Sequence, residues 1–240
     1  MPGEDRPTVT TVRADRLHGR RKGKKLSARR SALMSGLLPT LRVDIDRPPL
    51  VRAADLFSRP VDTVRLEIGF GGGEHLVAEA AAAPTGGFIG VEPFINGMAK
   101  AVAAISDRGL QNVRVFDGDA ARLLDWLPRE SLNRVDLLYP DPWPKKRHWK
   151  RRFVNPENLD RISRVLRRGG ELRFVSDISN YVEWTLSHLL RRSDFQWTAQ
   201  RADDWRKPWA DWPGTRYEAK ALRAGRRPAY LIFRRLSAAP

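Results

Sequence analysis

The sequence contains no cysteine in 240 residues. This absence excludes disulfides, iron–sulfur clusters and thiolate zinc sites, and it removes sulfur as a covalent nucleophile. The four histidines are scattered, without the paired spacing of a metal site; they are His18, His75, His148 and His188. We therefore expect no metal in this protein and no thiol chemistry.

Long apolar runs are missing as well. No stretch of the sequence approaches the roughly 18 apolar residues that a membrane-spanning helix requires. The N-terminus carries Glu4, Asp5 and Arg6 in place of the apolar stretch of a signal peptide. We expect a soluble cytoplasmic protein without a membrane partner.

Acidic residues are scarce relative to basic ones. The chain has 28 Asp and Glu against 44 Lys and Arg, a formal net charge of +16. Such an excess predicts a polyanionic partner, and nucleic acid fits best. Residues 1–30 hold ten basic and three acidic residues and almost nothing apolar, which predicts a flexible basic arm.

Beyond the arm, residues 31–60 form a short helix and a proline-punctuated connection, and residues 61–240 form the main domain. In this domain, short apolar segments alternate with helical ones, a pattern typical of a parallel sheet wrapped by helices. The expected strands are 64–68, 88–91, 113–116, 135–139, 172–175 and 230–233, and 195–198 is expected to pair with the last of them. The fold class is thus α/β, a doubly wound, mostly parallel, Rossmann-like sheet with an antiparallel C-terminal strand.

A glycine-rich turn follows the first strand, with Glu67 before it and Gly69 and Gly71 within it. Glycines here let the backbone approach a ligand closely, although a plain strand-to-helix turn would look the same. Glu74 stands where a dinucleotide-binding motif needs its third glycine, which disfavours NAD and FAD. Glu67 would repel a pyrophosphate, so a cationic ligand fits better.

Two further acids end the next two strands. Glu92 lies where a side chain can accept hydrogen bonds from both ribose hydroxyls, and Asp119 lies where it can bond an adenine amine. Each acid alone is more often a helix N-cap. Together on a cationic chain they favour an adenosine that carries positive charge, and S-adenosylmethionine is the obvious candidate.

The fourth strand leads into Leu-Tyr-Pro-Asp-Pro-Trp-Pro between Leu138 and Pro144. Its prolines fix φ and remove backbone donors, which makes this segment a rigid loop around Asp141. An aromatic side chain, Trp143, and a run of cations follow directly. A carboxylate beside an aromatic face suits a heterocyclic base, and the cations suit its phosphates.

These motifs resemble those of the bacterial tRNA (guanine-N7-)-methyltransferases, of the TrmB type. The resemblance covers roughly residues 15–236. It rests on Glu67-Ile-Gly-Phe-Gly, Gly90-Val-Glu92, Gly118-Asp119-Ala120, Pro140-Asp-Pro-Trp-Pro-Lys-Lys-Arg-His148, Lys150-Arg-Arg152, Ser176-Asp177 and Gly214-Thr-Arg-Tyr-Glu-Ala-Lys220. It implies a seven-stranded class I methyltransferase sheet, S-adenosylmethionine as the methyl donor, and a guanosine at position 46 of the tRNA variable loop as the acceptor.

The resemblance also assigns roles to residues. Asp141 matches the catalytic position. The cofactor-binding residues expected from the turn and the resemblance are Glu67, Gly69, Gly71, Glu92, Asp119 and Asp141. The substrate-binding positions are Lys145, Asp177, Thr215, Arg216, Tyr217 and Glu218. The expected RNA contacts are Lys146, Arg147, His148, Trp149, Lys150 and Arg151.

The chemistry agrees with what the chain lacks. Guanine N7 carries an in-plane lone pair, so its methylation needs neither a cysteine nor a general base. Asp177 and Glu218 could accept from guanine N1–H and the exocyclic amine, or they could simply cap helices and pair with arginines.

Two other functions stay open. Asp141-Pro142-Trp143 partly imitates the loop of amino-group methyltransferases, and a non-catalytic RNA-binding protein could retain the same fold. The sequence leaves open whether the protein is a monomer or a homodimer.

Overall fold

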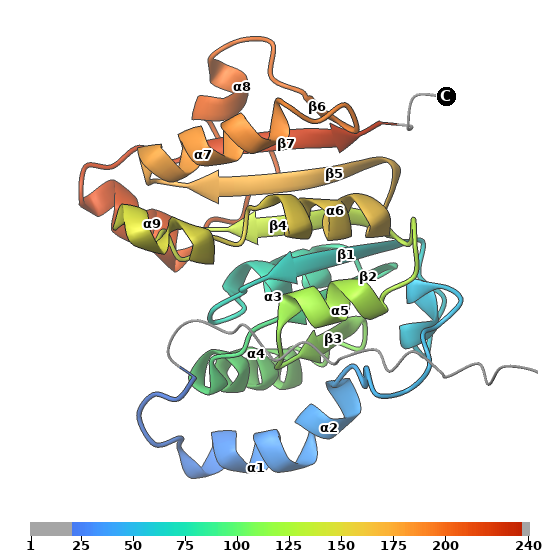
Figure 1. The fold of residues 1–240 in the computed structure, drawn as a ribbon. Coiled ribbons are helices and arrows are strands. Elements are labelled where there is room, and N and C mark those ends of the chain that lie inside the picture. Colours follow the sequence, from blue (N-terminus) through green and yellow to red (C-terminus); the bar gives the residue numbers. More distant parts are fainter. Residues whose placement is uncertain (1–20, 237–240) are drawn as a thin grey trace, which may run out of the picture.

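The computed structural model describes residues 21–236, which form one α/β unit around a seven-stranded sheet (Figure 1). The strands are β1 (Thr63–Ile68), β2 (Gly86–Val91), β3 (Val113–Phe116), β4 (Leu132–Leu138), β5 (Leu166–Ser176), β6 (Phe195–Trp197) and β7 (Ala229–Arg235). Their order is β3-β2-β1-β4-β5-β7-β6. The strands β1 to β5 pair in parallel, whereas β7 is antiparallel to both β5 and β6.

Helices cover both faces of this sheet. They are α1 (Ala28–Gly36), α2 (Leu38–Leu41), α3 (Glu74–Ala82), α4 (Ile95–Asp107), α5 (Ala120–Trp126), α6 (Pro156–Val165), α7 (Ser179–Leu189), α8 (Asp203–Arg206) and α9 (Arg216–Arg223), with 3-10 turns η1 (Ala53–Leu56) and η2 (Lys146–Arg151). One apolar core joins the sheet to α5, α6 and α7, and a second joins it to α2, α3 and α4. Every residue of β2 is buried, as in a strand covered on both faces.

The expected doubly wound sheet with an antiparallel C-terminal strand is confirmed, and the predicted strands fall where the hydrophobic pattern placed them. One strand differs in extent. The strand β5 begins at Leu166, six residues before its predicted start, because Leu166 already pairs with Leu132 of β4. The pair Gly169-Gly170 lies within this strand, where the register with β4 shifts.

The predicted basic arm is only partly described. Residues 1–20 lie outside the described part of the chain. Residues 21–30, expected to be flexible as well, contact the start of α4: Gly23 N donates to Asn96 Oδ1 (2.6 Å), and Asn96 Nδ2 donates to the Lys24 carbonyl (2.7 Å). The helix α1 then begins at Ala28, capped by Ser27. Local sequence could not show this contact, because Asn96 lies far along the chain.

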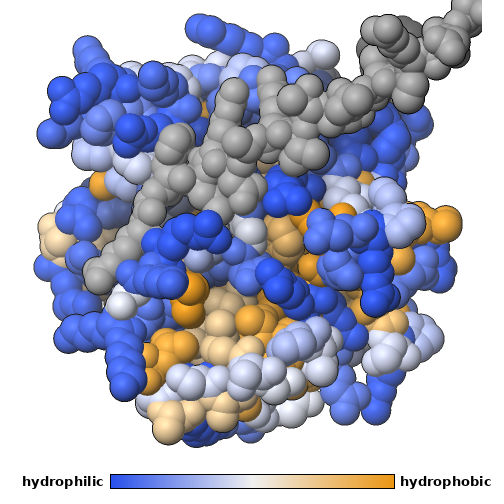
Figure 2. Space-filling model, turned by 60° about the horizontal axis from the view of Figure 1, so that its bottom comes forward, coloured by the Kyte–Doolittle hydropathy of each residue, from blue (hydrophilic) through white to orange (hydrophobic). Residues whose placement is uncertain are grey.

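The surface agrees with the charge balance. Figure 2 brings forward the end of the molecule that carries α1 and α2, where hydrophilic residues surround a smaller apolar area. The helix α1 has no fully buried residue. Within residues 21–236, no helix combines the length and apolarity that crossing a bilayer would require.

The packing of α4 against the glycine turn gives the first prediction. A Cβ on Gly97 would collide with the carbonyl oxygen of Gly71. Although alanine favours a helix over glycine, Gly97→Ala should lower the free energy of unfolding by about 1–3 kcal/mol, because the overlap is with backbone. Thermal denaturation measures the change. Gly36→Ala is the control, since its Cβ would meet no atom, and equal melting temperatures for the two variants would contradict the prediction.

Candidate active site

A cavity of about 430 Å³ opens at the carboxyl ends of the parallel strands. Its walls come from the turn after β1, the ends of β2, β3 and β4, the loop before η2, and the start of α9. They include Gly69, Gly71, Glu92, Asp119, Asp141, Trp143, Arg151, Arg216 and Tyr217. The strand order reverses between β1 and β4, and such a point leaves a crevice in which nucleotides bind. The volume suits a ligand of nucleoside size.

The glycine turn presents bare backbone to this cavity. Gly69 and Gly71 have φ values of 74° and 61°, a left-handed conformation that favours glycine. A Cβ on Gly69 would meet no protein atom within 4 Å, although Gly69 lines the cavity. A ligand can therefore lie directly against this stretch of main chain.

Glu92 faces the cavity and also holds the glycine turn. Its Oε2 accepts a hydrogen bond from the Gly71 backbone N–H (2.6 Å), and its Oε1 accepts one from the Phe94 N–H (2.9 Å). Burial raises the pKa of the Glu92 carboxyl, and the Phe94 and Gly71 donors oppose that rise. The side chain thus fixes the approach of the turn to the end of β2.

Asp119 caps α5 and lines the cavity at the same time. Its Oδ1 accepts from the backbone N–H of Ala121 (2.9 Å). The helix-cap interpretation is therefore correct for Asp119. It does not exclude the ligand interpretation, because a carboxylate has acceptor positions beyond those that one cap uses.

Glu67 lies on the other side of the glycine turn. Leu66 and Ile68 face the core under α5 to α7, so strand alternation sends Glu67 to the opposite face, under α3. There its Oε2 lies 2.8 Å from His75 Nδ1, and both side chains are buried. Burial raises the pKa of Glu67. Burial alone would lower the pKa of His75, but the Glu67 carboxylate outweighs it and raises that pKa.

The structure therefore brings Gly69, Gly71, Glu92, Asp119 and Asp141 to one cavity and places the Glu67 carboxylate behind it. A direct contact of Glu67 with a cofactor remains a prediction. In this conformation Glu67 supports the turn through His75.

The loop that carries Asp141 has a strained backbone. Tyr139 and Trp143, on either side of Asp141, have φ values of 49° and 46°. A non-glycine residue in such a conformation costs about 1–3 kcal/mol and persists only where its surroundings impose it. The two strained residues, Tyr139 and Trp143, therefore fix the backbone on both sides of Asp141 at the cavity. Asp141 is exposed, and its partial desolvation by the neighbouring protein raises the pKa of its carboxyl.

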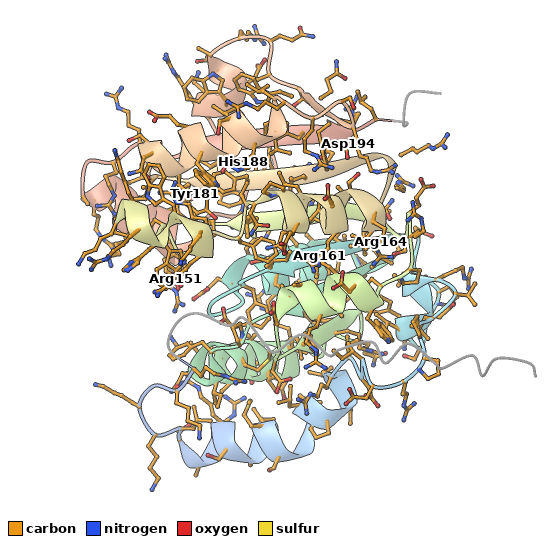
Figure 3. All side chains as sticks on the ribbon, viewed as in Figure 1. Arg151, Arg161, Arg164, Tyr181, His188 and Asp194 are labelled. Atoms are coloured by element: carbon orange, nitrogen blue, oxygen red, sulfur yellow. The ribbon has the colours of Figure 1, made fainter. Side chains whose placement is uncertain are left out.

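The cations after this loop are mostly exposed. Lys145 precedes η2, and Lys146, Arg147, Lys150 and Arg151 lie on it, all with exposed side chains. The Arg151 guanidinium lies 5.0 Å from the centre of the Trp143 ring at the cavity wall. Figure 3 shows Arg151 at the edge of the molecule where the parallel strands end. Desolvation and the surrounding cations lower the pKa of His148.

Trp149 differs from the other expected RNA contacts. Its ring packs edge-on against Trp184, with 5.7 Å between centroids, and its Nε1 is buried. In this conformation Trp149 is a packing residue, because burial of its large apolar ring against α7 is more favourable than exposure of the ring to solvent.

The expected substrate-binding residues do not all line the cavity. Arg216 and Tyr217 line the cavity, and the Arg216 Nη2 donates to the Tyr217 hydroxyl (3.0 Å). Thr215 caps α9 by accepting from the Glu218 N–H (3.0 Å), so its side chain has a structural role here.

Glu218 and Asp177 lie behind Tyr139. Glu218 is buried and accepts from Trp212 Nε1 (2.7 Å) and from the Tyr230 hydroxyl. Asp177 is paired with Arg226. Desolvation, followed by Tyr230, Glu218 and Asp177, raises the pKa of Tyr139, which lines the cavity. These two acids thus belong to the cavity's surroundings.

Sequence reasoning missed other wall residues. Phe94, Tyr139 and Phe153 also line the cavity. In the sequence, only their position next to the motif residues indicates that they could line the site. The sequence also counts Arg152 among the cations that suit the phosphates. This is wrong for the described conformation, because Arg152 is fully buried.

The site has no feature of a metal centre. Among residues 21–236, no group of three His, Cys, Asp or Glu side chains is arranged to hold a metal ion. The walls combine bare main chain, carboxylates and aromatic rings on a strongly cationic protein. The three carboxylates of the wall suit a cationic adenosine ligand, and Arg151 and Arg216 line the cavity as well.

Comparison with solved structures supports the fold. The 16S rRNA methyltransferase KamB superposes with a TM-score of 0.56 at 17% identity, over 74% of this chain and 89% of that one. TrmN from Thermus thermophilus gives 0.50 at 18% identity, over 76% of this chain and 46% of that one. The sheet therefore has the fold of the class I methyltransferases.

Comparison of sequences gives the family. A family model described as a putative methyltransferase matches residues 62–231. The tRNA (guanine-N(7)-)-methyltransferase of Rhodopseudomonas palustris (strain BisB5) is 59% identical over 220 residues, 92% of this chain and 86% of the relative. That of Mesorhizobium japonicum is 56% identical over 235 residues, 97% and 99% of the two chains. The chain belongs to the tRNA (guanine-N7-)-methyltransferase family.

The two hydrogen bonds of Glu92 give the second prediction. Glutamine at this position keeps one oxygen acceptor, so Glu92→Gln leaves either the Gly71 or the Phe94 N–H unpaired beside the cavity. Affinity for S-adenosylmethionine should fall about tenfold through the loosened turn and the lost charge, as calorimetry can measure. Glu157→Gln, a change on the surface of α6, is the control. Unchanged affinity in Glu92→Gln would show that neither the charge of Glu92 nor its second hydrogen bond to the turn contributes to cofactor binding.

Proposed function

We propose that this protein transfers the methyl group of S-adenosylmethionine to N7 of a guanosine in tRNA, at position 46 of the variable loop. The observation that carries the proposal is the strained Asp141 loop, which lies between an acid-lined cavity and an exposed run of cations. Membership of the tRNA (guanine-N7-)-methyltransferase family supports the donor and the acceptor.

The cavity residues fit the donor. Gly69 offers main chain with free space above it, and Glu92 and Asp119 end adjacent strands where a ribose and an adenine amine would lie. S-adenosylmethionine supplies an electrophilic methyl group on a positively charged sulfur. Carboxylates on the cavity wall would stabilise that positive charge.

The role of Asp141 follows from charge. Methylation of N7 leaves positive charge on the purine. A carboxylate held beside the base therefore stabilises the positive charge that develops in the transition state. Because the rigid loop fixes the Asp141 carboxylate in place, the carboxylate needs little movement to reach the transition state. Trp143 and Tyr217, on the same cavity wall, offer aromatic faces for the base.

The acids behind Tyr139 would recognise guanine. Glu218 and Asp177 already accept hydrogen bonds from protein donors, and carboxylate oxygens retain capacity to accept more. Guanine N1–H and its exocyclic amine are donors that adenine does not present in the same arrangement. We propose that Lys145 and the cations of η2 bind the tRNA phosphates. We further propose that the protein acts in the cytoplasm, as a monomer or a homodimer.

Methylation of defined transcripts tests the function. A tRNA transcript with guanosine at position 46 should incorporate labelled methyl groups and become cleavable by borohydride and aniline at that nucleotide. A transcript with adenosine there should not. Label on an exocyclic amine would favour the amino-group alternative. The absence of any transfer, with RNA binding retained, would favour the non-catalytic one.

The role of Asp141 gives the third prediction. Asp141→Asn keeps the shape of the side chain and removes its charge. Turnover should fall about 100-fold or more, while tRNA affinity stays within about threefold of the parent. Asp125→Asn, which disturbs a surface pair with Arg161, is the control for loss of one carboxylate. A parent-like turnover in Asp141→Asn would rule out the electrostatic role.

The exposed cations give the fourth prediction. Lys146→Ala combined with Lys150→Ala should weaken tRNA binding and reduce the slope of log affinity against log salt by about 1–2, because fewer counterions are released. Filter binding across a salt series measures the slope. Arg167→Ala combined with Arg168→Ala removes two exposed cations from the start of β5, at the opposite edge of the sheet. Equal slopes for both pairs would show that η2 is not the phosphate-binding segment.

A further inference from the structure

Arg152 is the most unusual charged residue of the described chain. It directly follows the exposed cations of η2, yet its side chain is fully buried. The guanidinium lies 4.5 Å from the centre of the Trp149 ring, 4.6 Å from that of Tyr181 and 5.5 Å from that of Trp184. Burying a cation is costly unless its donors are bonded.

The Arg152 donors connect two segments of the site. Nε donates to the Pro142 carbonyl (3.0 Å), Nη1 to the Asn180 carbonyl (3.0 Å) and Nη2 to Asn180 Oδ1 (2.5 Å). Pro142 is the residue directly after Asp141, and Asn180 is in the first turn of α7, shortly after Asp177. One guanidinium thus fastens the Asp141 loop to the helix that follows β5.

The Asp141 loop needs such a support. The side of the loop nearest β4 is held by the sheet, since the Tyr139 N–H donates to the Val175 carbonyl (2.8 Å). The far side lies between Trp143, whose backbone is left-handed, and the exposed η2 segment. The prolines at 140, 142 and 144 contribute no N–H to hold the loop. The carbonyl of Pro142 is the acceptor that Arg152 reaches.

We propose that Arg152 is a positioning residue, which holds Asp141 at its catalytic place by clamping the Pro142 carbonyl to the start of α7. This inference rests on the proposed function. Only arginine can do this, because the planar fork supplies three directed donors and stacks on rings, whereas lysine supplies one compact charge. A displacement of the loop by about 1 Å can cost two orders of magnitude in rate.

The test compares Arg152→Met and Arg152→Lys with a matched control, Arg164→Met. Arg164 also donates to backbone carbonyls, those of Leu124, Asp125 and Leu127, but it lies on α6, away from Arg151 (Figure 3). Turnover at saturating tRNA and donor should fall about 30-fold or more in both Arg152 variants. The KM for tRNA should change by less than about threefold, because the phosphate-binding cations remain exposed.

A second readout does not depend on activity. Trypsin cleavage of the folded protein within residues 145–151 should become at least about tenfold faster in Arg152→Met and should be unchanged in Arg164→Met, because only the first loosens the loop. Asn180→Ala, which keeps the Asn180 carbonyl, should show the same pattern in weaker form. If Arg152→Met does not fold, Asn180→Ala replaces it in this test.

The outcomes separate the two proposals. If the parent and Arg164→Met fail to methylate tRNA, the proposed function is wrong. If the parent is active and a folded Arg152→Met or Asn180→Ala keeps parental turnover and protease resistance, the clamp is wrong. Equal losses of turnover in Arg152→Met and Arg164→Met would also overturn it, since they would reflect general destabilisation.

Discussion

The reversal of strand order between β1 and β4 is the constraint on which the site depends. Parallel strands deliver their carboxyl ends to one edge, and the reversal leaves that edge open at the centre of the sheet. Residues from segments far apart in the chain meet there: the glycine turn after β1, Glu92 after β2, Asp119 after β3 and Asp141 after β4. The antiparallel β7 completes the same edge by placing Tyr230 against Glu218.

Charge is divided within this architecture. The protein is strongly basic, yet the cavity wall carries three carboxylates, and the cations of η2 begin directly beyond the last of them. The proposed function uses both sets of charges: the carboxylates would face the positive methyl donor and the cation that develops on the base, and the lysines and arginines would face the tRNA phosphates. Asp141 lies between the other two carboxylates and the cations of η2.

Several residues act through others. Glu67 supports the glycine turn through His75, Glu92 bonds the same turn directly, and Trp212 and Tyr230 hold Glu218. Arg152 holds the Asp141 loop through its hydrogen bond to the Pro142 carbonyl. The precision of the site therefore lies in a layer of buried polar contacts beneath the cavity wall, and few of these residues carry the chemistry themselves.

The sequence by itself determined the sheet, the order of its elements and the glycines and acids at the strand ends, because apolar periodicity and the carboxyl ends of parallel strands are local features. It gave no means to foresee that Glu67 would turn to His75, that Trp149 would pack on Trp184, or that Asn96 would hold residues 21–24. Each of these contacts joins side chains whose orientation depends on the packing of a neighbouring element. Arg152 illustrates the difference best: in sequence it is one more cation in a basic run, and only the tertiary structure encloses it in aromatic rings and gives its donors the Pro142 and Asn180 oxygens.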